Sequence, residues 1–206
     1  MIENGRKRIW LWGLTLLLLL PGCVTLERSY PDKHFFVLDI DGVKPLDNPH
    51  QGVLQISSVR ISPRYQAKNF TYRLSDTSYE SDFYDEFLIA PATLIAEELA
   101  KGLTRAAIFQ HVIDSSSQLA PTHSLEAAVN AIYGDFRSGS APKAVLEMEF
   151  FVSKETAGKS EILMQKRYSK SVPLERRSAD ALVKGWNKGL EEILANLAAD
   201  LKGANL

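Results

Sequence analysis

The clearest strand signal in the chain is the stretch Leu125-Glu126-Ala127-Ala128-Val129-Asn130-Ala131-Ile132-Tyr133. Its apolar residues recur at every second position from Leu125 to Tyr133, which is the period of a half-buried β-strand. The same alternation returns in residues 144–152, opposite Glu147 and Glu149. Residues 162–172 predict a third strand, with Lys166, Arg167 and Lys170 on its more polar face. Because the connection 154–160 contains Gly158 and is hairpin-sized, the three segments predict an antiparallel meander.

Two helices flank this meander in the sequence. The first opens at Pro91, a position where the missing N–H of proline costs nothing, and runs to about Ala107. Gly102 lies in its interior and is expected to allow close packing on a sheet. The second helix begins after Ser178, a residue type that caps helix N-termini, and Gly203 closes it. Trp186 lies in the middle of its apolar stripe, so we expect this side chain to be buried against the sheet.

The segments before and between the helices complete a single α+β domain. Residues 34–39, 69–75 and 109–113 predict strands, and residues 53–61, apolar on both faces, predict a central strand. Residues 79–88 fit a helix and an extended strand about equally well. The sum is a mostly antiparallel or mixed sheet with two main helices packed on it.

The N-terminus has the layout of a secretory signal. Arg6, Lys7 and Arg8 precede an apolar run of about a dozen residues, short of the ~20 that span a bilayer, and the run ends in Leu20-Pro21-Gly22-Cys23. This stretch resembles a bacterial lipobox, although Pro21 departs from the small residues usual there. The resemblance implies cleavage between Gly22 and Cys23 and acylation of Cys23, whose chains hold a protein on a membrane.

This interpretation divides the chain into three parts. Residues 1–22 form a lipoprotein signal peptide, residues 23–33 a lipid-anchored linker, and residues 34–206 the folded domain. The alternative is a buried or unpaired cysteine in an uncleaved N-terminal helix. Since Val24 follows the cysteine, rather than the Asp that retains lipoproteins in the inner membrane, we expect residence in the outer membrane, facing the periplasm.

Composition and motifs exclude several functional classes. Removing the signal leaves 21 basic and 24 acidic residues, a balance that argues against binding nucleic acid. Cys23 is the only cysteine, so no thiolate metal site remains, and the four histidines lack metal-ligand spacing. We find no nucleophile elbow and no phosphate-binding loop. The prediction is therefore a non-enzymatic protein without a cofactor. Two groups of acidic residues are expected to be solvated: Glu97 and Glu98 on the face of a helix, and Asp82, Asp85 and Glu86 in an exposed turn.

One segment is unusually rich in aromatic residues. Tyr79, Phe83, Tyr84 and Phe87 lie within nine residues, together with four acidic residues. Aromatic side chains are enriched at binding hot spots, and acidic neighbours keep a free surface soluble. We therefore predict that these four residues dock a second copy of the chain or another protein. The alternative, that they only cover the core, remains open.

The order of these pieces resembles the ABC-type transport auxiliary lipoproteins. The resemblance rests on the lipobox, Phe36-Val37-Leu38, Phe109-Gln110-His111-Val112, the strand from Leu125 to Arg137 with Ile132-Tyr133-Gly134-Asp135-Phe136-Arg137, and the helix from Ala181 to Leu201. Members often carry a Trp ahead of the first helix, where this chain has Phe87. The resemblance implies a fold similar to the small α/β domain at the N-terminus of the Tol system's periplasmic protein.

The resemblance also implies a function. It predicts the auxiliary component of a system that moves lipids between the two membranes of a diderm bacterium. The implied partners are an Mce-type substrate-binding protein and, through it, an inner-membrane ABC ATPase and permease; self-association is a further expectation. The alternative is an outer-membrane lipoprotein that activates a cell-wall synthase or assists envelope assembly, although such proteins tend to have longer linkers.

Overall fold

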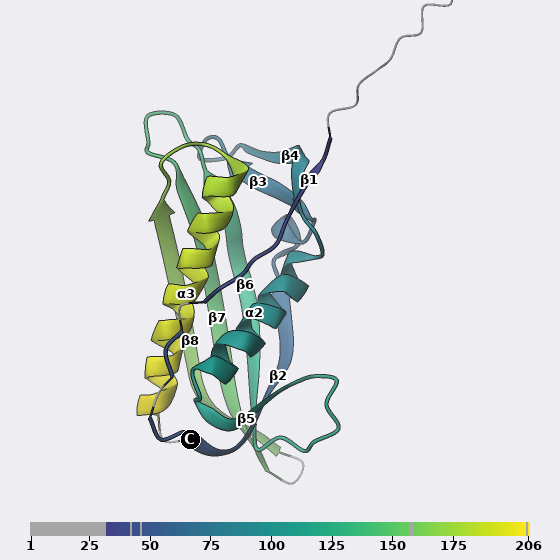
Figure 1. Ribbon diagram of the computed structural model, residues 1–206, viewed down its shortest axis with the longest axis vertical. Coiled ribbons are helices and arrows are strands. Elements are labelled where there is room, and N and C mark those ends of the chain that lie inside the picture. The colour runs from purple at the N-terminus through teal and green to yellow at the C-terminus, as the bar shows by residue number, and fades with distance from the viewer. Residues whose placement is uncertain (1–31, 42, 46, 157–158, 205) are drawn as a thin grey trace, which may run out of the picture. The chain divides into compact units, whose positions relative to one another are not determined.

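The computed structural model describes residues 32–41, 43–45, 47–156, 159–204 and 206. They form one compact unit in which two long helices lie on the same face of an eight-stranded mixed sheet (Figure 1). This confirms the predicted α+β domain. In chain order the elements are β1 (His34–Phe36), β2 (His50–Ile61), the 3-10 turn η1 (Pro63–Tyr65), β3 (Asn69–Arg73), β4 (Tyr79–Phe87), α2 (Pro91–Arg105), β5 (Phe109–Asp114), β6 (His123–Asp135), β7 (Lys143–Thr156), β8 (Lys159–Pro173) and α3 (Ala179–Gly203).

The predicted antiparallel meander is confirmed in β6, β7 and β8. Leu125 of β6 faces Val152 of β7, and Met148 of β7 faces Tyr168 of β8. The alternation in β7 is the one that the sequence shows, because Ala144, Leu146, Met148, Phe150 and Val152 are all buried. This meander forms the long half of the sheet, and α3 packs across β7 and β8.

The other half of the sheet is built largely from parallel pairs, which the sequence did not predict. β2 runs parallel to β6, and after η1 the chain resumes beside the same strand as β3. β5 adds parallel to β2, β4 pairs antiparallel with β3, and β1 adds parallel to β4. Parallel neighbours need long crossover connections. Alternation within one segment cannot show which strands such a connection brings together.

Two β-bulges change which residues face the helices. In β6, Val129 pairs with Met148 but Ala131 pairs with Glu147, so Asn130 is an extra residue. Leu125, Ala127 and Val129 therefore face the helices, whereas Ala131 and Tyr133 face the opposite side of the sheet. The expectation that the whole alternating stretch shares one face is wrong for this reason.

The same device explains the two apolar faces of β2. Ile56 pairs with Leu125 and Ser58 with Glu126, which leaves Ser57 as the extra residue. Its hydroxyl donates to the backbone oxygen of Leu125 (3.1 Å). The apolar residues on both sides of the bulge thereby turn toward the helices, so β2 needs only one apolar face.

The helix α3 supplies the centre of the core. Ser178 caps it, accepting a hydrogen bond from the backbone N–H of Ala181, as predicted. Trp186 is 1% exposed, which confirms its predicted burial, and its ring lies 5.0 Å from that of Phe70 and 5.4 Å from that of Phe87. The last helix thus packs on β3 and β4 as well as on the meander.

The chain between β1 and β2 lies between the two helices. The backbone N–H groups of Asp39, Ile40 and Asp41 donate to the side chains of Asn187, Glu98 and Glu191 respectively. Glu98 is 1% exposed, so the prediction that it is solvated is wrong; it is buried because it accepts from Ile40 (2.9 Å) and from Lys101 (2.6 Å).

Gly102 serves the packing of helix on helix rather than of helix on sheet. A Cβ atom at this position would lie 2.7 Å from the Cδ1 atom of Leu194 on α3. A side chain at this position would therefore force the Leu194 side chain to move.

Candidate docking surface on β1 and β4

The segment 79–87 is a strand, β4, interrupted by a bulge of four residues, 82–85. Ser81 pairs with Thr71 and Glu86 with Asn69, so the residues between them stand opposite the single residue Phe70. Such a bulge bends the strand and re-aims its side chains. It resolves the ambiguous period of this segment in the sequence.

Asp82 holds the bulge in place. Its carboxylate accepts hydrogen bonds from the Tyr72 hydroxyl (2.6 Å) and from the backbone N–H groups of Tyr84 (2.7 Å) and Asp85 (3.0 Å). Asn69 donates to the backbone oxygen of Asp82 (2.7 Å). Burial raises the pKa of Asp82, but the hydrogen bonds outweigh this effect and the pKa lies below its ordinary value. Burial, followed by Asp82 itself, raises the pKa of Tyr72.

The bulge presents two aromatic rings to solvent. Phe83 is 67% exposed and Tyr84 41% exposed, and their rings meet edge to face at 5.2 Å. The neighbouring edge strand and the residues after β4 add further exposed apolar side chains. We define the β1–β4 surface as Phe35, Val37, Phe83, Tyr84 and Leu88.

Two acidic residues beside this surface have basic partners. His34 Nδ1 lies 2.9 Å from Asp85 Oδ1, and Lys33 Nζ lies 3.1 Å from Glu86 Oε2. Lys33 Nζ also lies 5.3 Å from the centre of the Phe83 ring. The prediction of an exposed acidic turn is therefore wrong: these acids belong to a strand, Glu86 is buried, and each has a partner.

The structure separates the four aromatic residues that the sequence singled out. Phe87 is 2% exposed and packs on Phe70 at 4.7 Å, so it belongs to the core, as the alternative interpretation held. Tyr79 is 42% exposed but lies apart from Phe83, against the Tyr133 ring (5.8 Å) and 5.9 Å from the Arg73 guanidinium. Only Phe83 and Tyr84 share the bulge.

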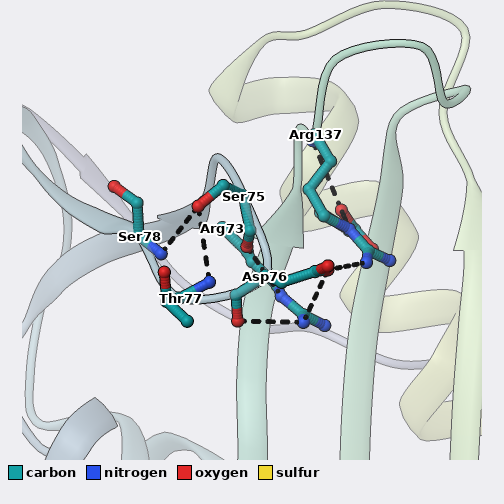
Figure 2. A network of polar contacts seen from close by, with 7 residues as sticks. Arg73, Ser75, Asp76, Thr77, Ser78 and Arg137 are labelled. Carbon is teal, nitrogen blue, oxygen red and sulfur yellow. Dashed lines mark hydrogen bonds and ion pairs between the residues drawn. The ribbon is translucent and has the colours of Figure 1, made fainter.

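A polar network ties the β3–β4 turn to the end of β6. Figure 2 shows Asp76 of this turn between the guanidinium groups of Arg73 and Arg137. Arg137 Nη1 donates to Asp76 Oδ1 (2.8 Å), while its Nε and Nη2 donate to Asp135 (3.0 and 2.8 Å). These bonds hold the pKa of Asp135 below its ordinary value. The network fixes the hairpin that carries the bulge.

Ser75 shapes the turn from within. Its hydroxyl oxygen accepts hydrogen bonds from the backbone N–H groups of Thr77 (3.3 Å) and Ser78 (2.9 Å), as Figure 2 shows. Serine hydroxyls commonly stabilise turns in this way.

The described residues hold no group of three or more metal-ligating side chains. Thr122 Oγ1 lies 3.0 Å from His123 Nδ1, but His123 is 5% exposed and the threonine hydroxyl also lies 3.1 Å from the Val53 oxygen. This pair therefore serves packing. What the described residues do offer is an exposed aromatic surface on a braced bulge, which suits binding.

Sequence reasoning missed Phe35, Val37 and Leu88. Apolar residues in a strand pattern are normally assigned to the core, and Phe36, between Phe35 and Val37, does pack there against Phe70. A very short strand with apolar residues on both faces is the signal that could have identified them.

The predicted lipid-attachment and cleavage residues, Cys23 and Gly22, lie outside the described residues. Within the part that is described, no helix is both long enough and apolar enough to cross a membrane.

Comparison with known proteins gives a family and a fold. Residues 38–198 match the family model described as the ABC-type transport auxiliary lipoprotein component. No curated protein matches the chain. Protein XCC0632 from Xanthomonas campestris is similar in structure, with a TM-score of 0.69 at 10% identity over 80% of this chain and 92% of that one. The hypothetical protein CT253 from Chlamydia trachomatis gives 0.52 at 12% identity, over 75% and 99%. At these identities the likeness concerns the fold alone.

Proposed function

The chain belongs to the family of ABC-type transport auxiliary lipoproteins, and we propose that it serves an Mce-type system that moves lipids between the inner and outer membranes. The family match, which spans both helices and most of the sheet, is the observation that carries this proposal. In this role the chain is a non-enzymatic partner of the Mce-type substrate-binding protein, which links it to an ABC ATPase and permease.

The proposed anchor is the acylated Cys23. The run from Arg6 to Gly22 supplies the signal, and Val24 favours the outer membrane, with the domain facing the periplasm. The linker from Cys23 to Lys33 reaches about 30 Å when extended, so the domain stays near the membrane.

The proposed docking site is the β1–β4 surface. Its bulge is held by four hydrogen bonds around Asp82, and Asp85 and Glu86 lie against His34 and Lys33. A partner that covers Phe83 and Tyr84 therefore meets carboxylates that already have hydrogen-bond or ion-pair partners, which lowers the cost of removing them from water. The proposed occupant is the Mce-type protein or a second copy of this chain. Tyr79, outside this surface, is proposed to contact the same partner at its margin.

Binding of the mature chain (residues 23–206, expressed without the signal and with Cys23→Ser) to a purified Mce-type protein of the same bacterium tests the proposal. We expect Phe83→Ala to weaken binding or self-association at least tenfold while the domain stays folded. Leu119→Ala is the matched control, since Leu119 is 60% exposed and lies in the β5–β6 connection. Absence of binding by the unsubstituted chain would contradict the proposed function; equal loss in both variants would contradict the docking site.

A further inference from the structure

One edge of β2 has no neighbouring strand. At residues 54–56, β2 is paired on both edges, with β5 on one and β6 on the other. The pairing with β5 ends where Ile56 meets Asp114, while the pairing with β6 continues to Ile61. Within the described part of the chain, the edge from Ser57 to Ile61 therefore faces no strand. Its backbone N–H and C=O groups on that side are free to pair.

The empty position lies between two strands of the same sheet. β3 continues beside β6 where β2 leaves off, and β4 lies outside β3 just as β5 lies outside β2. The space between the end of β5 and β4 thus has the place of a missing strand. β5 stops because Asp114 turns the chain: its carboxylate accepts from the backbone N–H (2.7 Å) and the hydroxyl of Ser116.

A groove of about 380 Å³ lies at this edge, between β2 and α2. Ile56 and Val59 line it from the sheet, and Thr93, Ala96 and Ala100 line it from the helix. Thr93, Ala96 and Ala100 are small, so they leave room for an added backbone, and Glu97 and Lys101 line the groove beside them. An acyl chain could fill the apolar part, but it has no groups to pair with the free edge of β2. The unpaired backbone therefore selects a polypeptide.

The charges around the groove specify the peptide further. Lys101 is paired with Glu98 (2.6 Å), and Arg60 lies 3.6 Å from Glu126. Glu97 and Asp114 also line the groove, and neither takes part in an ion pair among the described residues. Hydrogen bonds from Ser116 hold the pKa of Asp114 below its ordinary value, so it stays anionic. The uncompensated charge is negative and complements a basic side chain.

We propose that an extended segment of a partner protein adds to the free edge of β2 at residues 57–61, beneath α2. This is the binding mode known as β-augmentation, in which backbone hydrogen bonds give affinity and side-chain pockets give specificity. Small or apolar side chains of the segment face Ala96 and Ala100. A lysine or arginine of the segment lies near Glu97 and Asp114.

The test uses a phage library of random twelve-residue peptides, selected on the full mature chain carrying Cys23→Ser. Peptides obtained in this way are synthesised, and their affinity is measured by fluorescence anisotropy. Ala96→Arg fills the groove from the helix. Thr104→Arg makes the same kind of change at an exposed α2 position outside the groove and is the matched control.

We expect selected peptides to bind the unsubstituted chain and Thr104→Arg equally, and Ala96→Arg at least tenfold more weakly. Hydrogen exchange of the amides in residues 57–61 should slow when the peptide is bound, as strand pairing requires. Failure to select a peptide, or peptides that are insensitive to Ala96→Arg, or peptides that protect another segment, would overturn the proposal. Self-association that Ala96→Arg alone abolishes would also overturn it, by identifying a second copy as the occupant. None of these results depends on the proposed transport role.

Discussion

The hydroxyl of Tyr72 on β3 donates a 2.6 Å hydrogen bond to the carboxylate of Asp82 on β4. This one contact joins the regular strand of the hairpin to the bulge on the other strand. It thereby gives the bulge, which carries Phe83 and Tyr84, a defined conformation. The exposed aromatic pair is thus a product of specific polar contacts rather than of a loose loop.

We predict that Tyr72→Phe destabilises the domain by about 1.5–3 kcal/mol, because a hydrogen bond to a charged acceptor is lost. Urea unfolding of the mature chain with Cys23→Ser measures this change. Tyr84→Phe removes a hydroxyl from the same bulge, at a residue 41% exposed, and should change stability by less than about 0.5 kcal/mol. Equal losses of stability in the two variants would show that the hydrogen bond from Tyr72 to Asp82 does not stabilise the bulge.

We predict that Trp186→Ala destabilises the domain by about 3–5 kcal/mol, since Trp186 is buried between Phe70 and Phe87. Phe83→Ala should cost less than about 0.5 kcal/mol, because Phe83 is 67% exposed. Both values come from chemical denaturation. A large loss of stability in Phe83→Ala would mean that this ring contributes to the fold. It would then not be a side chain that is free to bind a partner.

Glu98 and Glu97 are neighbours with opposite environments. Glu98→Ala leaves the backbone N–H of Ile40 without its acceptor, so we expect a loss of about 1–3 kcal/mol. Glu97→Ala, at an exposed position of the same helix, should be nearly neutral. The two unfolding midpoints should therefore differ clearly. Coincident midpoints would show that Glu98 does not hold the segment between the helices.

Acid should destabilise the domain through His123. Burial lowers the pKa of this imidazole, and Lys154 and His50 lower it further, against an opposing effect of Glu155. Because the unfolded chain takes up this proton near pH 6.5 and the folded chain does so only at lower pH, the contribution of His123 to stability is constant above pH 6.5 and falls below it. Unfolding midpoints from pH 8 to pH 5 test this. His123→Phe should make the unfolding midpoint fall less steeply with decreasing pH in that range. An unchanged slope would show that other groups cause the loss of stability.

We predict that the mature protein begins at Cys23 and carries acyl chains there. Intact mass of the detergent-extracted protein should show the loss of residues 1–22 and the added lipid. Cys23→Ser should leave the protein unacylated and the signal uncleaved. Fractionation on a density gradient tests the membrane: co-migration with inner-membrane markers would contradict the expectation from Val24.

Features that depend on neighbours along the chain could be predicted from the sequence. The meander followed from the alternation in β6, β7 and β8, since strand period and short hairpins are local properties. The start of α3 at Ser178 and the burial of Trp186 followed in the same way from capping and helical spacing. The family resemblance rested on the order of such pieces, so it too was available from the sequence.

Features that depend on pairing between distant segments could be read only from the folded chain. The parallel placement of β2 and β3 beside β6 joins segments whose contact no local pattern records. The bulges at Ser57 and Asn130 depend on partner strands, yet they reverse the faces that alternation assigns. Glu98 is buried because the Ile40 N–H, which lies far away in the sequence, requires an acceptor, and Phe83 is exposed because Tyr72 holds Asp82 across the hairpin. Burial of polar groups and exposure of apolar ones both depend on partners that only the fold brings together.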